Sequence, residues 1–147
     1  FYEDWDEAAY QNFLTLFSLD PNKKVKELSA GMRVKYLIAL ALSHKAKLFI
    51  FDEPTSGLDP VSRDELMEIF LQIVENGEKS ILFSTHITSD LEKCADGIVY
   101  IKAGELVKAA PKQEFIDYFQ KLKRPEETEA LSLEDIMVRM ERKHYDF

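Results

Sequence analysis

The sequence LFIFDEPTSGLDP, residues 48–60, decides the fold class. Its first four residues form an apolar run bounded by charge, which is typical of a strand buried on both faces in a parallel sheet. Two carboxylates, Asp52 and Glu53, follow directly, and Asp59-Pro60 predicts a helix start, with an acidic N-cap before a proline in the first turn. The stretch therefore predicts a strand, a polar loop and a helix in succession, the unit of α/β proteins.

The flanking segments continue this alternation. Periodicity and end signals predict helices over 6–18, 29–43, 59–75, 112–122 and from Ser132 onward, and strands over 80–84, 98–101 and 106–109. Ser89 and Glu92 have capping-box spacing and predict a further helix start, residues 102–105 a hairpin turn, and residues 123–130 a polar linker. Together these elements predict an α/β fold with a mostly parallel sheet and flanking helices.

Spacing also predicts which helical residues face the core. In the helix over 29–43, an i, i+3, i+4, i+7, i+8 stripe consists of Val34, Leu37, Ile38, Ala41 and Leu42. The apolar side predicted for the first helix consists of Phe13, Leu14, Leu16 and Phe17. We expect these nine side chains to be buried.

Composition excludes several classes of protein. Of 147 residues, 46% are hydrophobic, and the longest unbroken apolar run, residues 36–42, is far shorter than the roughly 20 residues of a membrane span. The single cysteine, Cys94, cannot form an internal disulfide, and we expect a core or near-core thiol there. A net charge of −8 argues against a general nucleic-acid binder. The chain shows no signal peptide and begins with Phe1 instead of Met, so we expect a fragment.

The charge is unevenly distributed along the chain. Residues 21–47 contain seven bases and one acid, although the whole chain is acidic. Such a segment is compatible with a nearby anionic ligand or with a solvated, lysine-rich helix face.

Three candidate functional segments lie at strand or helix ends, where open parallel sheets bind ligands. Asp52 and Glu53 suit a divalent metal and activation of a water, or simply a polar loop. The segment 84–86 ends in His86, which either reaches the same ligand or is an ordinary residue at the end of a strand. Residues 28–32 open a helix and predict either a phosphate cradle or a plain Ser29 N-cap.

The order of these motifs resembles the ATP-binding cassette (ABC) family of ATPases. Leu28-Ser29-Ala30-Gly31-Met32 is similar to the signature motif, and residues 48–52 resemble the Walker B strand. Glu53 corresponds to the catalytic glutamate, Ser56-Gly57-Leu58-Asp59 to the D-loop, and His86 to the switch histidine. The resemblance is strongest from 28 to 110, and the last helix is similar to that of bacterial exporter-type ATP-binding subunits.

The resemblance implies a P-loop NTPase-like partial domain. Residues 1–46 would be the end of a helical subdomain with the signature helix, and residues 47–122 the C-terminal part of the catalytic core. Residues 123–147 would be a linker and a C-terminal helix. No G-x-x-x-x-G-K-S/T motif occurs, so the phosphate-loop half is missing from this sequence. We therefore expect the fragment alone to be inactive and one sheet edge to be exposed.

Roles also follow from the resemblance. Asp52 would hold Mg²⁺ through water, Glu53 would be the general base, and His86 would hydrogen-bond the γ-phosphate of ATP. Ser29 and the Gly31 backbone would bind ATP held mainly by the opposite protomer, and Asp59 would lie across the dimer interface. Ala30 and Met32 depart from the usual Gly and Gln of the signature. Ala adds a methyl group close to phosphate, and Met lacks the amide.

The implied partners are a second ATPase protomer, in a homodimer or heterodimer, and transmembrane permease subunits, with no nucleic acid. The implied location is cytoplasmic, at the inner face of the cell membrane. Two alternatives stay open. One is a soluble ABC-type ATPase in DNA maintenance or translation, and the other is a non-hydrolysing regulatory fragment.

Overall fold

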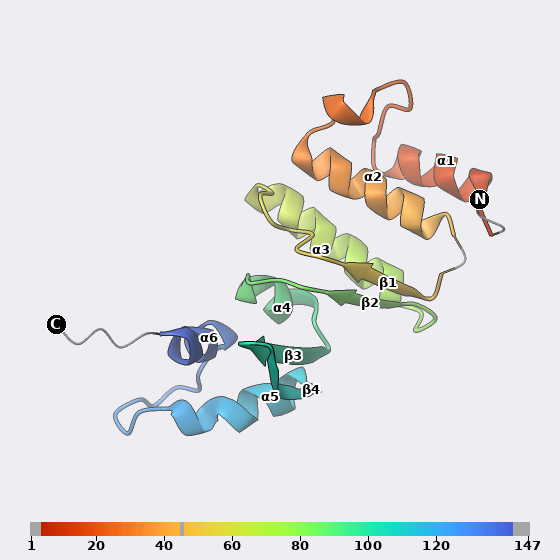
Figure 1. Ribbon diagram of the computed structural model, residues 1–147. Coiled ribbons are helices and arrows are strands. Elements are labelled where there is room, and N and C mark those ends of the chain that lie inside the picture. Colours follow the sequence, from red (N-terminus) through yellow and green to blue (C-terminus); the bar gives the residue numbers. More distant parts are fainter. Residues whose placement is uncertain (1–3, 45, 143–147) are drawn as a thin grey trace. The chain divides into compact units, whose positions relative to one another are not determined.

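The computed structural model describes residues 4–44 and 46–142, which form two compact units divided between Thr85 and His86. The first unit contains α1 (Glu7–Leu16), η1 (Val25–Glu27), α2 (Ala30–Leu42), β1 (Leu48–Phe51), α3 (Pro60–Val74) and β2 (Ser80–Phe83) (Figure 1). The second contains α4 (Thr88–Cys94), β3 (Gly97–Lys102), β4 (Glu105–Pro111), α5 (Lys112–Phe119), η2 (Gln120–Leu122) and α6 (Leu133–Glu141). The predicted helices and strands are confirmed, with bounds that differ by one or two residues, except that the helix predicted over 112–122 is divided into α5 and η2.

The first unit is built on a parallel pair of strands, as predicted. β1 and β2 run in register, with Phe51 opposite Phe83, and α3 covers one face of the pair. Phe70 of α3 stacks on Phe51 with ring centroids 5.2 Å apart and lies 5.6 Å from the ring of Phe83. This aromatic contact packs the carboxyl ends of both strands against the C-terminal half of α3.

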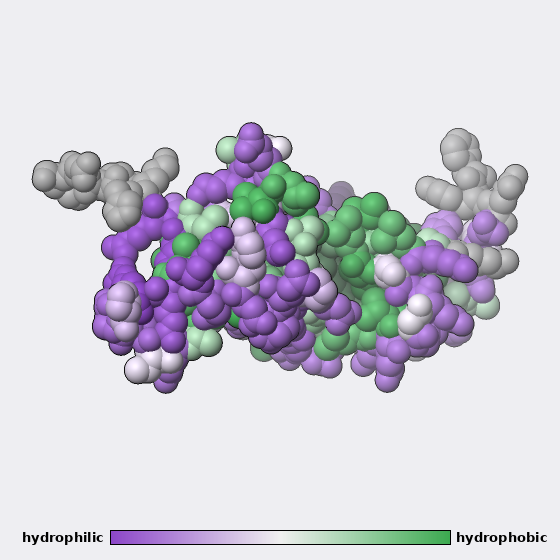
Figure 2. Space-filling model, turned by 90° about the horizontal axis from the view of Figure 1, so that it is seen from below, coloured by the Kyte–Doolittle hydropathy of each residue, from purple (hydrophilic) through white to green (hydrophobic). Residues whose placement is uncertain are grey.

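The prediction that β1 is buried on both faces is wrong. Phe49 is buried toward α3, whereas Leu48 and Ile50 are 55% and 69% exposed, and Leu82 beside them is 54% exposed. The described residues provide a helix on one side of this sheet only, so the other apolar face meets solvent. Figure 2 shows apolar side chains, in green, gathered in broad areas of the surface, as these exposures imply.

The helices α1 and α2 bury narrower stripes than their spacing predicts. Leu14 and Phe17 of the first stripe are buried, but Leu16 is 68% exposed, because a residue two positions from Leu14 points to the opposite side of the helix. In α2 the buried residues are Ile38, Ala39 and Leu42. Leu37 is exposed because the buried side of the helix is centred on Ile38, Ala39 and Leu42, and Leu37 lies at its margin.

The second unit packs a hairpin against helices. β3 and β4 are antiparallel, and the predicted turn is confirmed, with positive φ at Ala103 and Gly104 (51° and 80°), as hairpin turns of two residues require. The buried cluster of this unit consists of Ala95, Ile98, Tyr100, Phe115, Phe119, Leu131, Leu133 and Ile136. Burial and the hydrogen bond that its hydroxyl donates to Glu141 raise the pKa of Tyr100 to about 12.

Helix α4 corrects one predicted cap. The helix begins at Thr88, with Ile87 at the N-cap, so Ser89 lies inside the first turn and cannot cap it with Glu92. The thiol of Cys94, at the end of α4, is half-buried, and burial raises its pKa to about 11. A thiol with a raised pKa is a poor nucleophile, which agrees with the near-core thiol predicted from the sequence.

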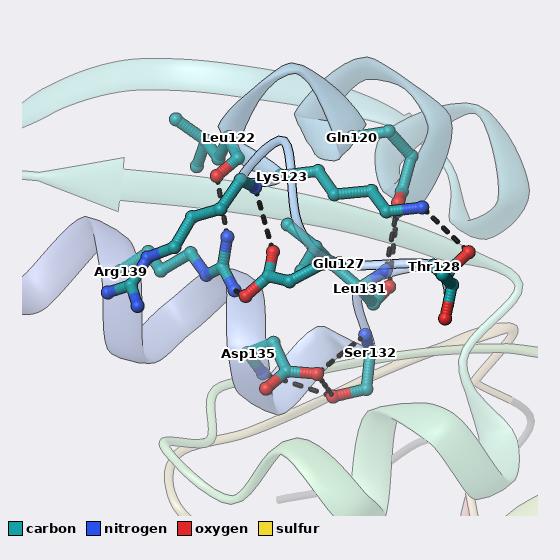
Figure 3. A network of polar contacts seen from close by, with 10 residues as sticks. Gln120, Leu122, Lys123, Glu127, Thr128, Leu131, Ser132, Asp135 and Arg139 are labelled. Atoms are coloured by element: carbon teal, nitrogen blue, oxygen red, sulfur yellow. Dashed lines mark hydrogen bonds and ion pairs between the residues drawn. The ribbon is translucent and has the colours of Figure 1, made fainter.

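The predicted polar linker between α5 and α6 is a loop fixed by hydrogen bonds (Figure 3). The Gln120 side chain donates to the Leu131 carbonyl at 3.1 Å and accepts from the Leu131 amide at 2.8 Å. Arg139 of α6 binds the Leu122 carbonyl and the Glu127 carboxylate, and this ion pair lowers the pKa of Glu127. The capping box predicted at Ser132, with Asp135 as its partner, is confirmed.

Candidate functional site

The two acids at the end of β1 are joined through the end of β2. The Ser84 hydroxyl donates to Asp52 Oδ1 at 2.6 Å and accepts the backbone N–H of Glu53 at 2.8 Å. The parallel register explains this arrangement, because Phe51 lies opposite Phe83 and the chain positions that follow are therefore neighbours. Asp52 is exposed and Glu53 is half-buried, so both acids lie at the surface of the first unit.

Glu53 has an uncommon backbone conformation. Its φ of 46° lies in the left-handed region, which costs a residue other than glycine about 1–3 kcal/mol. Directly after it, the Ser56 amide donates to the Glu53 carbonyl at 3.1 Å, and the Leu58 amide donates to the Thr55 carbonyl at 3.1 Å. These turns reverse the chain between the acids and α3. Backbone strain at such a position persists only where surrounding contacts hold it, as the Ser84 hydrogen bond does here.

Asp59 caps α3, as predicted. Its carboxylate accepts from the Val61 amide at 3.0 Å, the Ser62 amide at 3.1 Å and the Ser62 hydroxyl at 2.7 Å. The hydrogen bonds from Ser62 are the main cause of the lowered pKa of the Asp59 carboxyl. Pro60 occupies the first turn, where its missing N–H is not needed. Asp59 is therefore held as an anion at the positive end of a 15-residue helix.

The segment 29–32 lies at the corresponding end of α2. Ser29 is the N-cap, and its hydroxyl oxygen accepts from the Met32 amide at 3.2 Å. Ala30, Gly31 and Met32 form the first turn, so the backbone N–H groups of this turn lie at the helix end. This confirms the N-cap interpretation, and the phosphate-cradle interpretation stays a prediction.

The first turns of α2 and α3 are in contact. A Cβ placed on Gly31 would lie 3.1 Å from the Ser62 Oγ and 4.0 Å from the Leu58 Cδ2. An ion pair between Lys35 and Glu65 joins the same two helices farther along. The structure thus brings together segments 29–32 and 56–59 and the acids after β1 at one end of the first unit (Figure 1).

His86 is the first residue of the second unit and follows the end of β2 in the chain, before the start of α4. Its functional assignment therefore remains a prediction from sequence order.

Known proteins with similar sequences indicate the family of the chain. The family described as "AAA domain, putative AbiEii toxin, Type IV TA system" matches residues 5–89, which is more than half of the chain. The chain is 41% identical over 86 residues to the ABC transporter ATP-binding protein NatA of Bacillus subtilis, covering 58% of this chain and 35% of NatA. The chain belongs to the AAA-domain family and is related to ABC transporter ATP-binding proteins.

Two further similarities extend this result. The chain is 33% identical over 113 residues to the metal-staphylopine import system ATP-binding protein CntD of Staphylococcus aureus, covering 74% of this chain and 41% of that protein. A solved dimeric bacterial ABC transporter cassette superposes with a TM-score of 0.62 at 24% identity, covering 71% of this chain and 46% of the cassette, and supports the fold. The chain thus spans about a third to two fifths of the length of these two curated relatives.

The acids that follow β1 suit Mg²⁺ that keeps most of its water ligands. Among residues 4–44 and 46–142, no three His, Cys, Asp or Glu side chains are grouped so as to hold a metal ion. Mg²⁺ commonly keeps several waters and binds one or two carboxylates together with substrate phosphates. Asp52, an exposed carboxylate with one oxygen oriented by Ser84, fits that mode of binding.

Two polar contacts of the site were missed from the sequence. Ser62 was not singled out, although Asp59 and Ser62 have the spacing of a residue pair that shares a helix cap. The sequence places Ser84 only in the segment that ends in His86. The signal for its contact is a small hydroxyl residue directly after the neighbouring parallel strand.

In the part of the chain that the structure describes, no helix is both long and apolar enough to cross a membrane.

Proposed function

We propose that this chain is the C-terminal part of the ATP-binding subunit of an ABC transporter, in which ATP hydrolysis drives transmembrane transport. The names of the curated relatives support the transporter class. The single observation that supports it best is the contact between Gly31 and Ser62. Through that contact, the signature-like turn and the D-loop-like segment lie side by side at one end of the first unit, where both can face the ATP and the D-loop of a second protomer.

Hydrolysis is assigned to the residues that follow the two parallel strands. Glu53 accepts a proton from the attacking water as general base. Asp52 would hold Mg²⁺ through water, and bound Mg²⁺ would supply neutralisation of phosphate charge. His86 hydrogen-bonds the γ-phosphate and positions the attacking water. The parts that this chain supplies act mainly by positioning and by charge stabilisation.

The α2 terminus acts in trans in this proposal. Ser29 and the backbone of Gly31 bind the γ-phosphate of ATP held mainly by a second protomer, which is identical or homologous. A helix N-terminus favours such an anion through its N–H groups and its dipole. Ser56, Gly57, Leu58 and Asp59 lie at the dimer interface and couple the two sites. Ala30 and Met32 tune how tightly the opposite ATP is held.

The remaining partners follow from the transporter class. The subunit docks on transmembrane permease subunits at the cytoplasmic face of the membrane. Residues 1–46 belong to the helical subdomain, residues 47–122 to the catalytic core, and residues 123–147 to a C-terminal extension. The 147 residues contain no phosphate loop, so we expect the isolated chain to bind ATP weakly and not to hydrolyse it.

Phosphate release by the intact ATPase tests the proposal. Glu53→Gln should slow turnover by at least about 100-fold, because removing a general base costs about 10²–10⁴-fold. The control is Glu75→Gln, an exposed acid at the opposite end of α3, which should keep wild-type turnover. Turnover within about threefold of wild type in the Glu53 variant would remove Glu53 as the base.

A further inference from the structure

We propose that Ser84 is a positioning residue that sets the geometry of Asp52 and Glu53 from the neighbouring strand. This inference rests on the proposed function, because it assigns a role to Ser84 within the same hydrolytic site. Its basis is the pair of hydrogen bonds at 2.6 Å to Asp52 Oδ1 and at 2.8 Å from the Glu53 amide. One hydroxyl thus touches both residues to which the chemistry is assigned.

The chemistry of the partners fixes the direction of both hydrogen bonds. An ionised carboxylate can only accept, so the Ser84 O–H must donate to Asp52. A backbone N–H can only donate, so the same oxygen must accept from Glu53. A side chain at position 84 must therefore donate and accept at once, at short range. Serine and threonine do this, whereas alanine does neither.

The two hydrogen bonds act on different properties of the site. The hydrogen bond to Asp52 is charge-assisted and turns the Oδ1 oxygen of the carboxylate toward Ser84. The other carboxylate oxygen, Oδ2, is then the one that would face Mg²⁺. The one from Glu53 holds a backbone that is in the left-handed region, with φ at 46°. Both acids reach the surface, where water would otherwise compete for the same groups. Such outer contacts typically change metal affinity or activity by about 10–100-fold.

The test compares Ser84→Ala with Ser84→Thr in the intact ATPase. Ser80→Ala is the matched control, since Ser80 is an exposed serine at the opposite end of the same strand. For Ser84→Ala we expect kcat to fall about 10–100-fold, while KM for ATP stays within about threefold. Ser84→Thr should restore kcat to within about threefold, because it keeps the hydroxyl and the exposed position has room for a methyl group.

A second measurement does not depend on activity. Hydrogen–deuterium exchange of the Glu53 amide in the nucleotide-free protein should be faster in Ser84→Ala than in wild type, and unchanged in Ser84→Thr and Ser80→Ala. Either an unchanged kcat or an unchanged exchange rate of the Glu53 amide in Ser84→Ala would overturn the inference. So would an equal loss in the alanine and threonine variants, or a loss in Ser80→Ala, since each points to strand packing instead of the hydroxyl.

The Glu53→Gln variant separates this inference from the proposed function. If Glu53→Gln abolishes turnover and Ser84→Ala does not lower it, the positioning role fails and the proposed function stands. If Glu53→Gln keeps wild-type turnover, the proposed function fails whatever Ser84 does.

Discussion

Gly31 of α2 lies against Ser62 of α3 so closely that a Cβ on the glycine would come within 3.1 Å of the serine Oγ. The same Oγ donates to the Asp59 carboxylate at 2.7 Å. The contact therefore links the turn similar to the ABC signature with the cap of α3 through one side chain. A small residue is needed at position 31 for this packing alone, before any role in binding phosphate is considered.

A double-mutant cycle on this contact tests the packing. Gly31→Ala gains about 1 kcal/mol of helix propensity but crowds Ser62, and overpacking costs about 1–3 kcal/mol. In a Ser62→Ala background the Oγ is gone, so the same change should be more favourable by about 1 kcal/mol. Urea unfolding of the four proteins measures this coupling. Equal effects of Gly31→Ala in both backgrounds would show that the two residues do not interact.

The Asp59 cap predicts a dependence of stability on pH. Because hydrogen bonds lower the folded-state pKa of Asp59, its contribution is complete above the ordinary pKa of 3.8 and is lost as pH falls through the folded-state value. Asp59→Ala should therefore lower the free energy of unfolding at pH 7, and this deficit should shrink below pH 3.8. Urea unfolding at several pH values measures it. Asp59→Asn can still accept hydrogen bonds from the two amides, so it should lower the free energy of unfolding less at pH 7. A loss of stability in Asp59→Ala that does not change with pH would contradict the account.

Much of the fold could be predicted because local signals agree with the contacts. Asp59-Pro60, the pair at 103–104 and the Ser132 capping box each specify a backbone geometry by themselves, and all three are found. Burial could not be read in the same way. Leu48 and Ile50 have the apolar side chains that a strand covered on both faces requires, yet the described residues cover one face only. An apolar run in the sequence therefore does not predict whether one face or both faces of the strand are covered.

The loop before α6 predicts a specific loss of stability in the second unit. Gln120→Ala removes both hydrogen bonds to Leu131, whose side chain is 5% exposed, and leaves an amide and a carbonyl without that partner. Each unsatisfied group costs about 1–3 kcal/mol when buried, so we expect a loss of about 2 kcal/mol in the free energy of unfolding. Gln113→Ala, which removes only an exposed contact with Asp117, is the control and should cost less than about 0.5 kcal/mol. Similar losses in the two variants would show that Gln120 does not hold the loop.

The prediction for His86 concerns the chemical step in the intact ATPase. His86→Ala should lower kcat by at least about tenfold with a smaller effect on ATP affinity, because the imidazole is assigned to the γ-phosphate and the attacking water. Single-turnover hydrolysis and equilibrium ATP binding separate the two effects. His44→Ala, which removes a ring in edge-on contact with Trp5 (centroids 5.2 Å apart) beyond the C-terminal end of α2, should keep wild-type turnover. Unchanged turnover in the His86 variant would remove that residue from the site.

The candidate site was predictable as a set of residues but not as a set of contacts. The order of motifs identifies Ser29, Asp52, Glu53 and Asp59, because each follows a strand or opens a helix. The sequence does not say that Ser84 would join Asp52 to Glu53, since that contact depends on the register of β1 and β2. It also does not show the left-handed backbone of Glu53, because glutamate has no preference for that conformation.

The central claim is that the end of the first unit binds ATP between two protomers and that Glu53 then drives its hydrolysis. Size-exclusion chromatography of the intact Glu53→Gln protein with Mg²⁺ and ATP tests this most directly. The account predicts a stable dimer with ATP, a monomer without it, and loss of the dimer when Ser29→Arg is added at the α2 terminus. A Glu53→Gln protein that stays monomeric with ATP bound, or that dimerises equally with and without ATP, would contradict the claim.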